Sequence, residues 1–200
     1  MRLKLGGVGS RPAVFVDRDG TLTDEVGYVN HPSRLRLLPR SAEAIRRLNE
    51  AGIAALVVTN QAGLARGYFS EEVLAAVNAA LVARLKDEGA YLDGVYVCPH
   101  HPDEGAPPYR TVCDCRKPRP GLLYRAAADH GLDLTQATLI GDKPSDLVAA
   151  RAVGARSVLV LTGYGRGEWE HRRSTFTVPP DHVADDLCAA VDWVLSRRSP

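Results

Sequence analysis

The sequence has no long apolar run, no large excess of either charge and few cysteines, and each absence excludes something. No stretch approaches the roughly 20 apolar residues that cross a bilayer, so we expect no membrane partner. Segment 1–16 is charged and holds no long apolar stretch, so we expect no secretory signal. Lys and Arg number 25 against 24 Asp and Glu, and this balance argues against a nucleic-acid binder.

Cysteine is both scarce and unevenly placed. Of the four cysteines, three lie between residues 98 and 115, which indicates a local cluster and not a disulfide framework. This pattern favours the reducing cytoplasm. The 200 residues, 45% of them hydrophobic, suit a single domain over 1–200 with one core, and we expect a monomer.

Apolar runs alternate with amphipathic stretches along the chain. Strands are predicted at 13–17, 53–60, 94–100, 137–142 and 156–163, and helices at 39–52, 70–89, 121–131, 144–154 and 183–198. Buried strands that alternate with helices predict an α/β fold with a central parallel sheet and helices on both faces. The proline-rich segment 101–121 is predicted to be irregular, and the polar loop 163–182 receives no role.

Carboxylates follow two of the predicted strands. Asp17 and Asp19 follow the first strand, and Asp142 and Asp146 follow the fourth. Ligands of such sheets bind at the carboxyl ends of the strands, where these carboxylates would meet and repel one another. A hard divalent cation such as Mg2+ would neutralise them, because it prefers oxygen ligands. One such aspartate could merely cap a turn, but two motifs of this kind favour a metal site.

The spacing of the first pair also suggests a reaction. A carboxylate at a strand end can attack phosphorus, and a second carboxyl two residues later can protonate the departing alkoxide. The hydroxyl of Thr59, in "VVTNQAG", and the ammonium of Lys117, in "CRKPRPG", could hold the phosphate oxygens. The residues therefore predict phosphoryl transfer.

Four segments in order, "DRDGT", the threonine of "VVTN", the lysine of "RKP" and "GDKPSD", resemble the haloacid dehalogenase (HAD) superfamily of phosphotransferases. The resemblance implies a Rossmann-like core in which Asp17 is the nucleophile and an Mg2+ ligand. Asp19 would be the general acid/base and would bind Mg2+ through its backbone carbonyl, and Asp142 would complete the ligands. Thr59 and Lys117 would stabilise the transferring phosphoryl group.

Two further features follow from this resemblance. Asp146 would orient Lys117 or the waters of the metal, and Lys143 would lie beside the metal. The interval between the first two motifs holds one helix and its loops, which leaves no room for a large cap domain.

A second cluster combines Cys98, His100, Cys113 and Cys115 within the segment 98–117. Four soft ligands in two pairs suit tetrahedral Zn2+, although a one-residue spacing is tighter than in common zinc fingers. A Cys113–Cys115 disulfide, a redox-active pair and simple packing are the alternatives, and His101 is a competing imidazole. Structural zinc would order a loop with little apolar content and would fix Lys117.

The zinc loop "CPHHP…CDCRKPRPG", together with "DRDGTLTDEVGYV" and "VVTNQAGLARGYF", is similar to the heptose-bisphosphate phosphatases and to their histidinol-phosphate relatives. This similarity implies removal of the C7 phosphate of D-glycero-D-manno-heptose 1,7-bisphosphate, and it makes Arg116 part of the catalytic and recognition machinery. The implied substrate-binding residues are Arg18, Glu25, Val26, Gly27, Tyr28, Asn60, Gln61, Ala62, Arg116 and Lys117.

Three functions therefore remain in competition. The first is the sugar bisphosphate phosphatase, and the second is the same chemistry on histidinol phosphate or another small phosphomonoester. The third is a non-catalytic, zinc-stabilised phosphate-binding module. The intact set of catalytic residues speaks against it, because such a module has no use for acid/base groups; the set is Asp17, Asp19, Thr59, Lys117 and Asp142.

Overall fold

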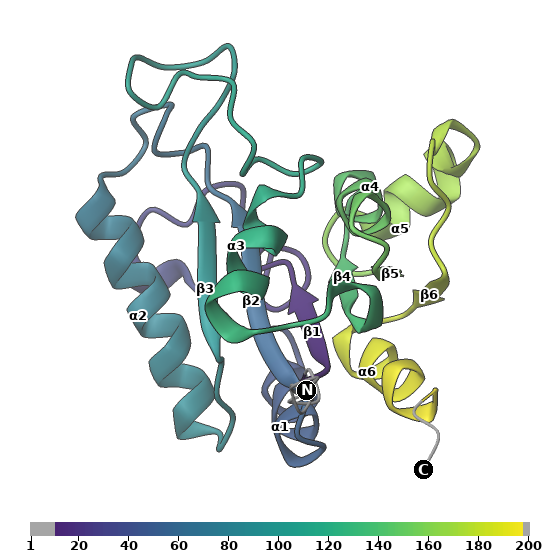
Figure 1. Ribbon diagram of the computed structural model, residues 1–200. Helices are drawn as coiled ribbons and strands as arrows, with labels where there is room; N and C mark the ends of the chain where they lie inside the picture. The colour runs from purple at the N-terminus through teal and green to yellow at the C-terminus, as the bar shows by residue number, and fades with distance from the viewer. Residues whose placement is uncertain (1–10, 198–200) are drawn as a thin grey trace, which may run out of the picture.

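The computed structural model describes residues 11–197, and within this range the strands form a six-stranded parallel sheet (Figure 1). The strands are β1 (Ala13–Val16), β2 (Ala54–Asn60), β3 (Gly94–Cys98), β4 (Thr138–Gly141), β5 (Arg156–Val160) and β6 (His182–Ala184). Their spatial order is β3-β2-β1-β4-β5-β6, so the direction of chain progression reverses between β1 and β4. A crevice outside the carboxyl ends of the strands at this reversal is where open α/β sheets bind ligands.

Helices cover both faces of the sheet, as predicted. They are α1 (Ser41–Glu50), α2 (Glu71–Asp87), α3 (Gly121–His130), α4 (Pro144–Ala152), α5 (Gly165–Gly167) and α6 (Leu187–Ser196). Val14 and Val16 of β1 belong to the core beneath α1, α2 and α6, whereas Ala13 and Phe15 belong to the core beneath α3 and α4. Successive side chains of a strand point to opposite faces, so a four-residue strand that is apolar throughout serves both cores.

The local signals at α2 act as the sequence predicts. The Ser70 side chain accepts a hydrogen bond from the backbone N–H of Val73, and Glu71 and Glu72 lie in the first turn of the helix. Both features stabilise the positive end of the helix dipole. Gly89 follows the helix with φ of +74°, a conformation that favours glycine. These signals set the two ends of α2, whose Val77, Leu81 and Leu85 pack in the same core as Val14 and Val16 of β1.

The C-terminal part of the chain differs from the prediction. The predicted loop 163–182 contains α5, a π-helical turn (Glu168–Arg172) and a 3₁₀ turn (Arg173–Thr175). The predicted start of the last helix is wrong, because His182–Ala184 pairs with Val158–Val160 as edge strand β6. Asp186 then caps α6 by accepting from the N–H of Ala189, and the predicted end at 198 lies outside the described residues.

Short loops surround the carboxyl edge of the sheet. Residues 17–40, between β1 and α1, hold turns and one 3₁₀ turn (Pro32–Arg34), so no large cap is inserted there. Another 3₁₀ turn (Leu134–Gln136) precedes β4 at the opposite edge. The irregular segment 99–120 extends beyond the end of β3 (teal, Figure 1). Among the described residues, no helix has the length and apolar character needed to span a membrane.

Candidate active site

A cavity of about 410 Å³ opens at the carboxyl ends of β1, β2 and β4. Most of the sequence-predicted site residues line this cavity. Its lining comprises Asp17, Asp19, Glu25, Gly27, Tyr28, Thr59, Asn60, Gln61, Ala62, Arg116, Lys117, Lys143, Ser145 and Tyr164. A volume of this size suits a small molecule rather than a macromolecule.

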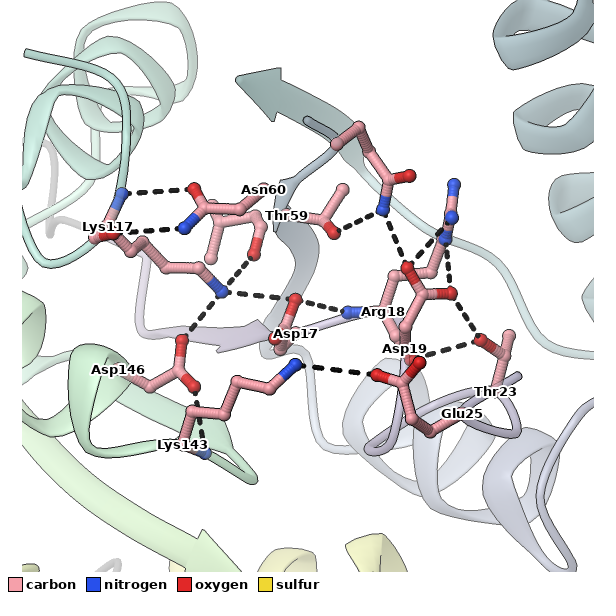
Figure 2. Close-up of polar contacts among 12 residues, drawn as sticks. Asp17, Arg18, Asp19, Thr23, Glu25, Thr59, Asn60, Lys117, Lys143 and Asp146 are labelled. Atoms are coloured by element: carbon pink, nitrogen blue, oxygen red, sulfur yellow. Dashed lines mark hydrogen bonds and ion pairs between the residues drawn. The ribbon is translucent and has the colours of Figure 1, made fainter. Parts of the chain in front are cut away.

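Lys117 lies between two carboxylates at the base of the cavity (Figure 2). Its Nζ is 3.1 Å from Asp17 Oδ1 and 2.6 Å from Asp146 Oδ1, and it donates to the carbonyl oxygen of Val58 at 2.8 Å. Burial alone would lower the pKa of Lys117, but the Asp146 and Asp17 carboxylates outweigh it and raise that pKa well above its ordinary value. Lys117 therefore stays charged next to Asp17.

Asn60 fixes the backbone of Lys117. Its Nδ2 donates to the Lys117 carbonyl at 3.0 Å, and its Oδ1 accepts from the Lys117 N–H at 3.0 Å. This two-way clamp joins the end of β2 to the irregular segment that carries the lysine. The sequence placed Asn60 among the substrate contacts, and in the structure its side-chain amide is occupied by Lys117.

Asp17, Asp142 and Asp146 form the carboxylate cluster, in which one oxygen of each lies within 4.8 Å of the others. Asp142 is fully buried, and its Oδ1 has no hydrogen-bond partner. Burial raises the pKa of Asp142 to about 7, and the charge of Asp17 adds to the shift. A buried carboxylate oxygen without a partner, beside two more carboxylates, is the donor set that a hard divalent cation requires.

Gly20 lets the chain pass close to this cluster. It has φ of +83°, and a Cβ atom there would overlap the carboxylate of Asp142. The main chain after the first motif can therefore turn against Asp142 only with glycine at this position.

Asp19 stands apart from the carboxylate cluster, and its side chain is held by other residues (Figure 2). Arg18 donates to both of its oxygens, from Nε at 3.0 Å and from Nη2 at 2.8 Å. Gln61 Nε2 donates to Asp19 Oδ2 at 2.7 Å and to Thr59 Oγ1 at 2.9 Å. The amide of Gln61 thus links the predicted acid/base to the predicted phosphate-binding hydroxyl.

Lys143 and Tyr164 form a wall on the other side of the cavity. The ammonium of Lys143 lies 3.4 Å from Glu25 Oε2 and 4.4 Å from the centre of the Tyr164 ring. Burial alone would lower the pKa of Lys143, but Asp142 and the other nearby carboxylates raise it. A protonated amine has no lone pair, so the Lys143 side chain does not qualify as a metal ligand.

Two predicted substrate contacts do not reach the cavity. Arg18 is fully buried and forms no part of the lining. Val26 packs against the core instead, and its carbonyl accepts from Arg34. Neither side chain lines the cavity in this structure, so a direct substrate contact by Arg18 or Val26 stays a prediction from the sequence.

Sequence reasoning missed Ser145 and Tyr164, which both line the cavity. Tyr164 follows β5, and its backbone N–H donates to Asp142 Oδ2 at 2.9 Å. The rule that ligands bind beyond strand ends would have found Tyr164, had it been applied to the strand ending near residue 160.

The segment 98–115 brings Cys98, His100, Cys113 and Cys115 together as the Cys/His cluster. The four sulfur–sulfur and sulfur–nitrogen contacts range from 3.3 to 3.9 Å. Four ligands around Zn2+ at about 2.3 Å would stand roughly 3.7 Å from one another, so these spacings fit a tetrahedral ion. His101 lies outside the cluster, where its Nδ1 accepts from two backbone N–H groups.

All four cysteines of the chain are free thiols in the structure. Cys113 and Cys115 have their sulfurs 3.3 Å apart, far beyond the roughly 2.05 Å of a disulfide bond. Burial raises the pKa of Cys98 and of Cys115, so without a cation these thiols would stay protonated. The Arg116 Nη1 donates to the carbonyl of His100 at 3.1 Å, which ties the cavity wall to the cluster.

Known proteins are similar to this chain in sequence and in fold. A family model for HAD-hydrolase-like proteins matches residues 114–190. The D-glycero-D-manno-heptose-1,7-bisphosphate 7-phosphatase of Thermosynechococcus vestitus is 41% identical over 198 residues, covering 95% of this chain and 98% of the relative. The corresponding phosphatase of Yersinia pestis is 41% identical over 188 residues, covering 94% and 91%.

Solved structures agree with these relatives. The crystal structure of the D,D-heptose 1,7-bisphosphate phosphatase from B. bronchiseptica, complexed with magnesium and phosphate, superposes with a TM-score of 0.82 at 33% identity. The match covers 94% of this chain and 99% of that one. Together with the sheet order and the cavity at its carboxyl edge, these matches identify an enzyme. This chain belongs to the heptose-1,7-bisphosphate 7-phosphatase family of HAD-like phosphoric monoester hydrolases.

Proposed function

We propose that this enzyme removes the C7 phosphate of D-glycero-D-manno-heptose 1,7-bisphosphate through a phosphoaspartate formed on Asp17. The observation that carries the proposal is the position of Asp17 in the cavity, with the charged ammonium of Lys117 3.1 Å from its Oδ1. The Lys117 ammonium attracts phosphate oxygens and so would hold the phosphoryl group beside the carboxylate that attacks it. The names of the most similar relatives supply the substrate.

The reaction uses each of the two first-motif carboxylates twice. The Asp17 carboxylate attacks phosphorus, the bond from phosphorus to the sugar oxygen breaks, and Asp19 gives its proton to that oxygen. Water then attacks the phosphorus of the phosphoaspartate, and Asp19 takes a proton from it. The bond between phosphorus and the Asp17 oxygen breaks and inorganic phosphate leaves, so Asp17 is again a carboxylate and Asp19 is again protonated.

Asp17 and Asp142, with the backbone carbonyl of Asp19, would hold Mg2+, whose charge would offset that of the phosphate. The free Oδ1 of Asp142 supports this assignment. Asp146 is engaged by Lys117 at 2.6 Å, and we assign it to orienting that lysine. Lys143 contributes its charge beside the metal site, and its side chain binds no metal.

The end of the substrate that is not hydrolysed would bind at the side of the cavity away from Asp17 and Asp142. Arg116 lines the cavity on the side of the Cys/His cluster and carries a planar guanidinium suited to phosphate or sugar hydroxyls. Gly27 and Tyr28, with Ala62, form the rest of a short wall that is open to solvent in part. Such a cavity, without a large cap, would select the substrate by its two charged ends.

Zn2+ in the Cys/His cluster would be structural. Four protein ligands leave no open position for water, so the ion would order the loop and not hydrolyse substrate. Free thiols and this cluster agree with a reducing compartment such as the cytoplasm, where we place the enzyme. A single domain and a monomeric state remain predictions from the sequence.

A panel of substrates tests the proposal. Heptose 1,7-bisphosphate, fructose 1,6-bisphosphate and histidinol phosphate would be assayed for phosphate release with Mg2+, and again after chelation and readdition of Mg2+. We expect kcat/KM to be highest for the heptose ester and activity to return with Mg2+. Equal rates on all three would refute the heptose assignment, and binding without turnover would favour the non-catalytic module.

A further inference from the structure

Arg18 lies next to Asp17 in sequence but on the other side of the sheet. Val14 and Val16 point into the core beneath α1, α2 and α6, and the alternation of strand side chains continues to Arg18. Its side chain is 0% exposed, and its Nη1 donates to Asn78 Oδ1 of α2 at 3.1 Å. A guanidinium this deeply buried is stable only with partners for its charge and its N–H groups.

The main partner of Arg18 is Asp19. The fork of Nε and Nη2 meets both carboxylate oxygens, at 3.0 and 2.8 Å (Figure 2). Gln61 Nε2 also donates to Oδ2, at 2.7 Å. Thr23 Oγ1 lies 3.3 Å from Oδ1, and its single O–H has the Arg18 carbonyl as a second acceptor at 3.2 Å. Because Arg18 donates to both oxygens and Gln61 donates to one, rotation of the carboxylate about its last bond would break several hydrogen bonds at once.

We propose that Arg18 is a positioning residue, which holds the Asp19 carboxyl in place at the cavity wall while Asn78 braces Arg18 from α2. The inference rests on the proposed function, because Asp19 is the acid/base only if the enzyme is a phosphatase. Arg18 itself touches no substrate, since it forms no part of the cavity wall. A shift of about 1 Å in a reacting group can cost roughly 10²-fold in rate.

The leaving group distinguishes positioning of Asp19 from general damage. A sugar alkoxide is a poor leaving group and needs the proton of Asp19, whereas p-nitrophenoxide departs without one. The value of kcat/KM reports the steps up to formation of the phosphoaspartate, so it isolates the step in which Asp19 acts as an acid. A misplaced Asp19 therefore lowers kcat/KM for alkyl esters and spares it for aryl esters.

The experiment compares Arg18→Lys with wild-type enzyme on heptose 1,7-bisphosphate and on p-nitrophenyl phosphate. Lysine keeps the charge but has no fork. We expect kcat/KM to fall about 10²-fold for the heptose ester and less than about threefold for the aryl ester. Arg47→Lys is the matched control, because Arg47 pairs with Asp192 on α6 outside the cavity, and it should change neither value.

Asn78→Ala is the second variant, and it keeps the test decisive if Arg18→Lys does not fold. It removes only the hydrogen bond from Arg18 to Asn78. We therefore expect kcat/KM to fall several-fold for the heptose ester and to change little for the aryl ester. Equal losses on both esters, or no loss on either, would overturn the inference while leaving the phosphatase assignment intact. A wild-type enzyme that hydrolyses neither ester would overturn the proposed function and this inference with it.

Discussion

The carboxylate cluster and the Cys/His cluster flank the same segment, yet they are built in different ways. Asp17 and Asp142 directly follow strands β1 and β4, and all three carboxylates of their cluster are buried. In the Cys/His cluster only Cys98 belongs to a strand, and the other three ligands lie on irregular backbone. The strands of the sheet therefore position the carboxylate cluster, whereas the positions of the Cys/His ligands depend mainly on their contacts with one another.

Lys117 connects the two clusters. It follows Cys115 by two residues, and its ammonium lies between Asp17 and Asp146. The loop that zinc would order thus delivers a cation to the carboxylate cluster at the edge of the sheet. Substitutions in the carboxylate cluster should therefore abolish turnover and leave the fold intact. Substitutions in the Cys/His cluster should first disorder the loop that carries Lys117.

The largest effect is expected from Asp17→Asn. The amide is nearly the same size but is not a nucleophile, so turnover should fall more than about 10³-fold with little change in thermal unfolding. Phosphate release and the melting temperature are the two measurements. Turnover close to that of the wild type would remove Asp17 from its assigned role, and a large loss of stability would contradict a cluster held by the sheet.

A slightly smaller effect is expected from Cys113→Ser. Loss of one thiolate should release zinc and loosen Lys117, which would lower kcat by roughly 10- to 100-fold. Zinc content by metal analysis and kcat are the measurements. Cys188→Ser is the matched control, because Cys188 packs in the core between α1 and α6 and should change neither. If the Cys113→Ser enzyme contained no zinc but kept full activity, the carboxylate cluster would not depend on the Cys/His cluster.

The response to pH tests the carboxylate cluster through Mg2+. The pKa of Asp142 is raised to about 7 in the folded protein, so without metal its contribution stabilises the protein at low pH and is lost as pH rises through 7. Mg2+ needs the ionised carboxylate and competes with that proton. The apparent Mg2+ affinity should therefore fall up to about tenfold per pH unit below 7.

Thermal unfolding with and without Mg2+ at pH 6, 7 and 8 measures this competition. We expect the rise in melting temperature on adding Mg2+ to be greatest at pH 8 and least at pH 6. Asp142→Asn should flatten the dependence on pH. An equal rise at all three values would contradict a role for Asp142 as a metal ligand.

The smallest effect is expected from Tyr164→Ala. The ring of Tyr164 is half exposed and lies against the ammonium of Lys143, a contact worth about 0.5–1 kcal/mol. Its loss should raise KM roughly two- to fivefold with little change in kcat. Tyr164→Phe keeps the ring and should behave like the wild type, and the backbone hydrogen bond to Asp142 is present in both. A fall in kcat alone would point to a role in chemistry and not in binding.

Much of the architecture could be predicted because it depends on local patterns. Buried apolar strands of four to seven residues that alternate with helices specify a parallel sheet covered on both faces. Aspartates directly after two such strands then specify a crowded, charged edge. In contrast, β6 has only three residues and gains its structure from pairing with β5, which no local pattern reveals.

The contacts at the site that the sequence did not reveal have equally physical causes. Arg18 was grouped with the substrate contacts because it lies between two reactive aspartates, although the alternation after Val14 and Val16 places it in the core. Asn60 and Gln61 line the cavity, but their amides hold Lys117 and Asp19, a dependence that only three-dimensional contacts show. Sequence motifs identify which groups meet, and they do not reveal which of those groups are already engaged.

The two-residue link between Cys115 and Lys117 has a consequence for the living cell. If the ordering of that lysine depends on four intact ligands, then oxidants or a shortage of zinc would lower the activity without altering any residue that binds phosphate. The output of the enzyme would then follow the thiol state and the metal supply of its surroundings, and sugar phosphates would accumulate upstream when either one fails.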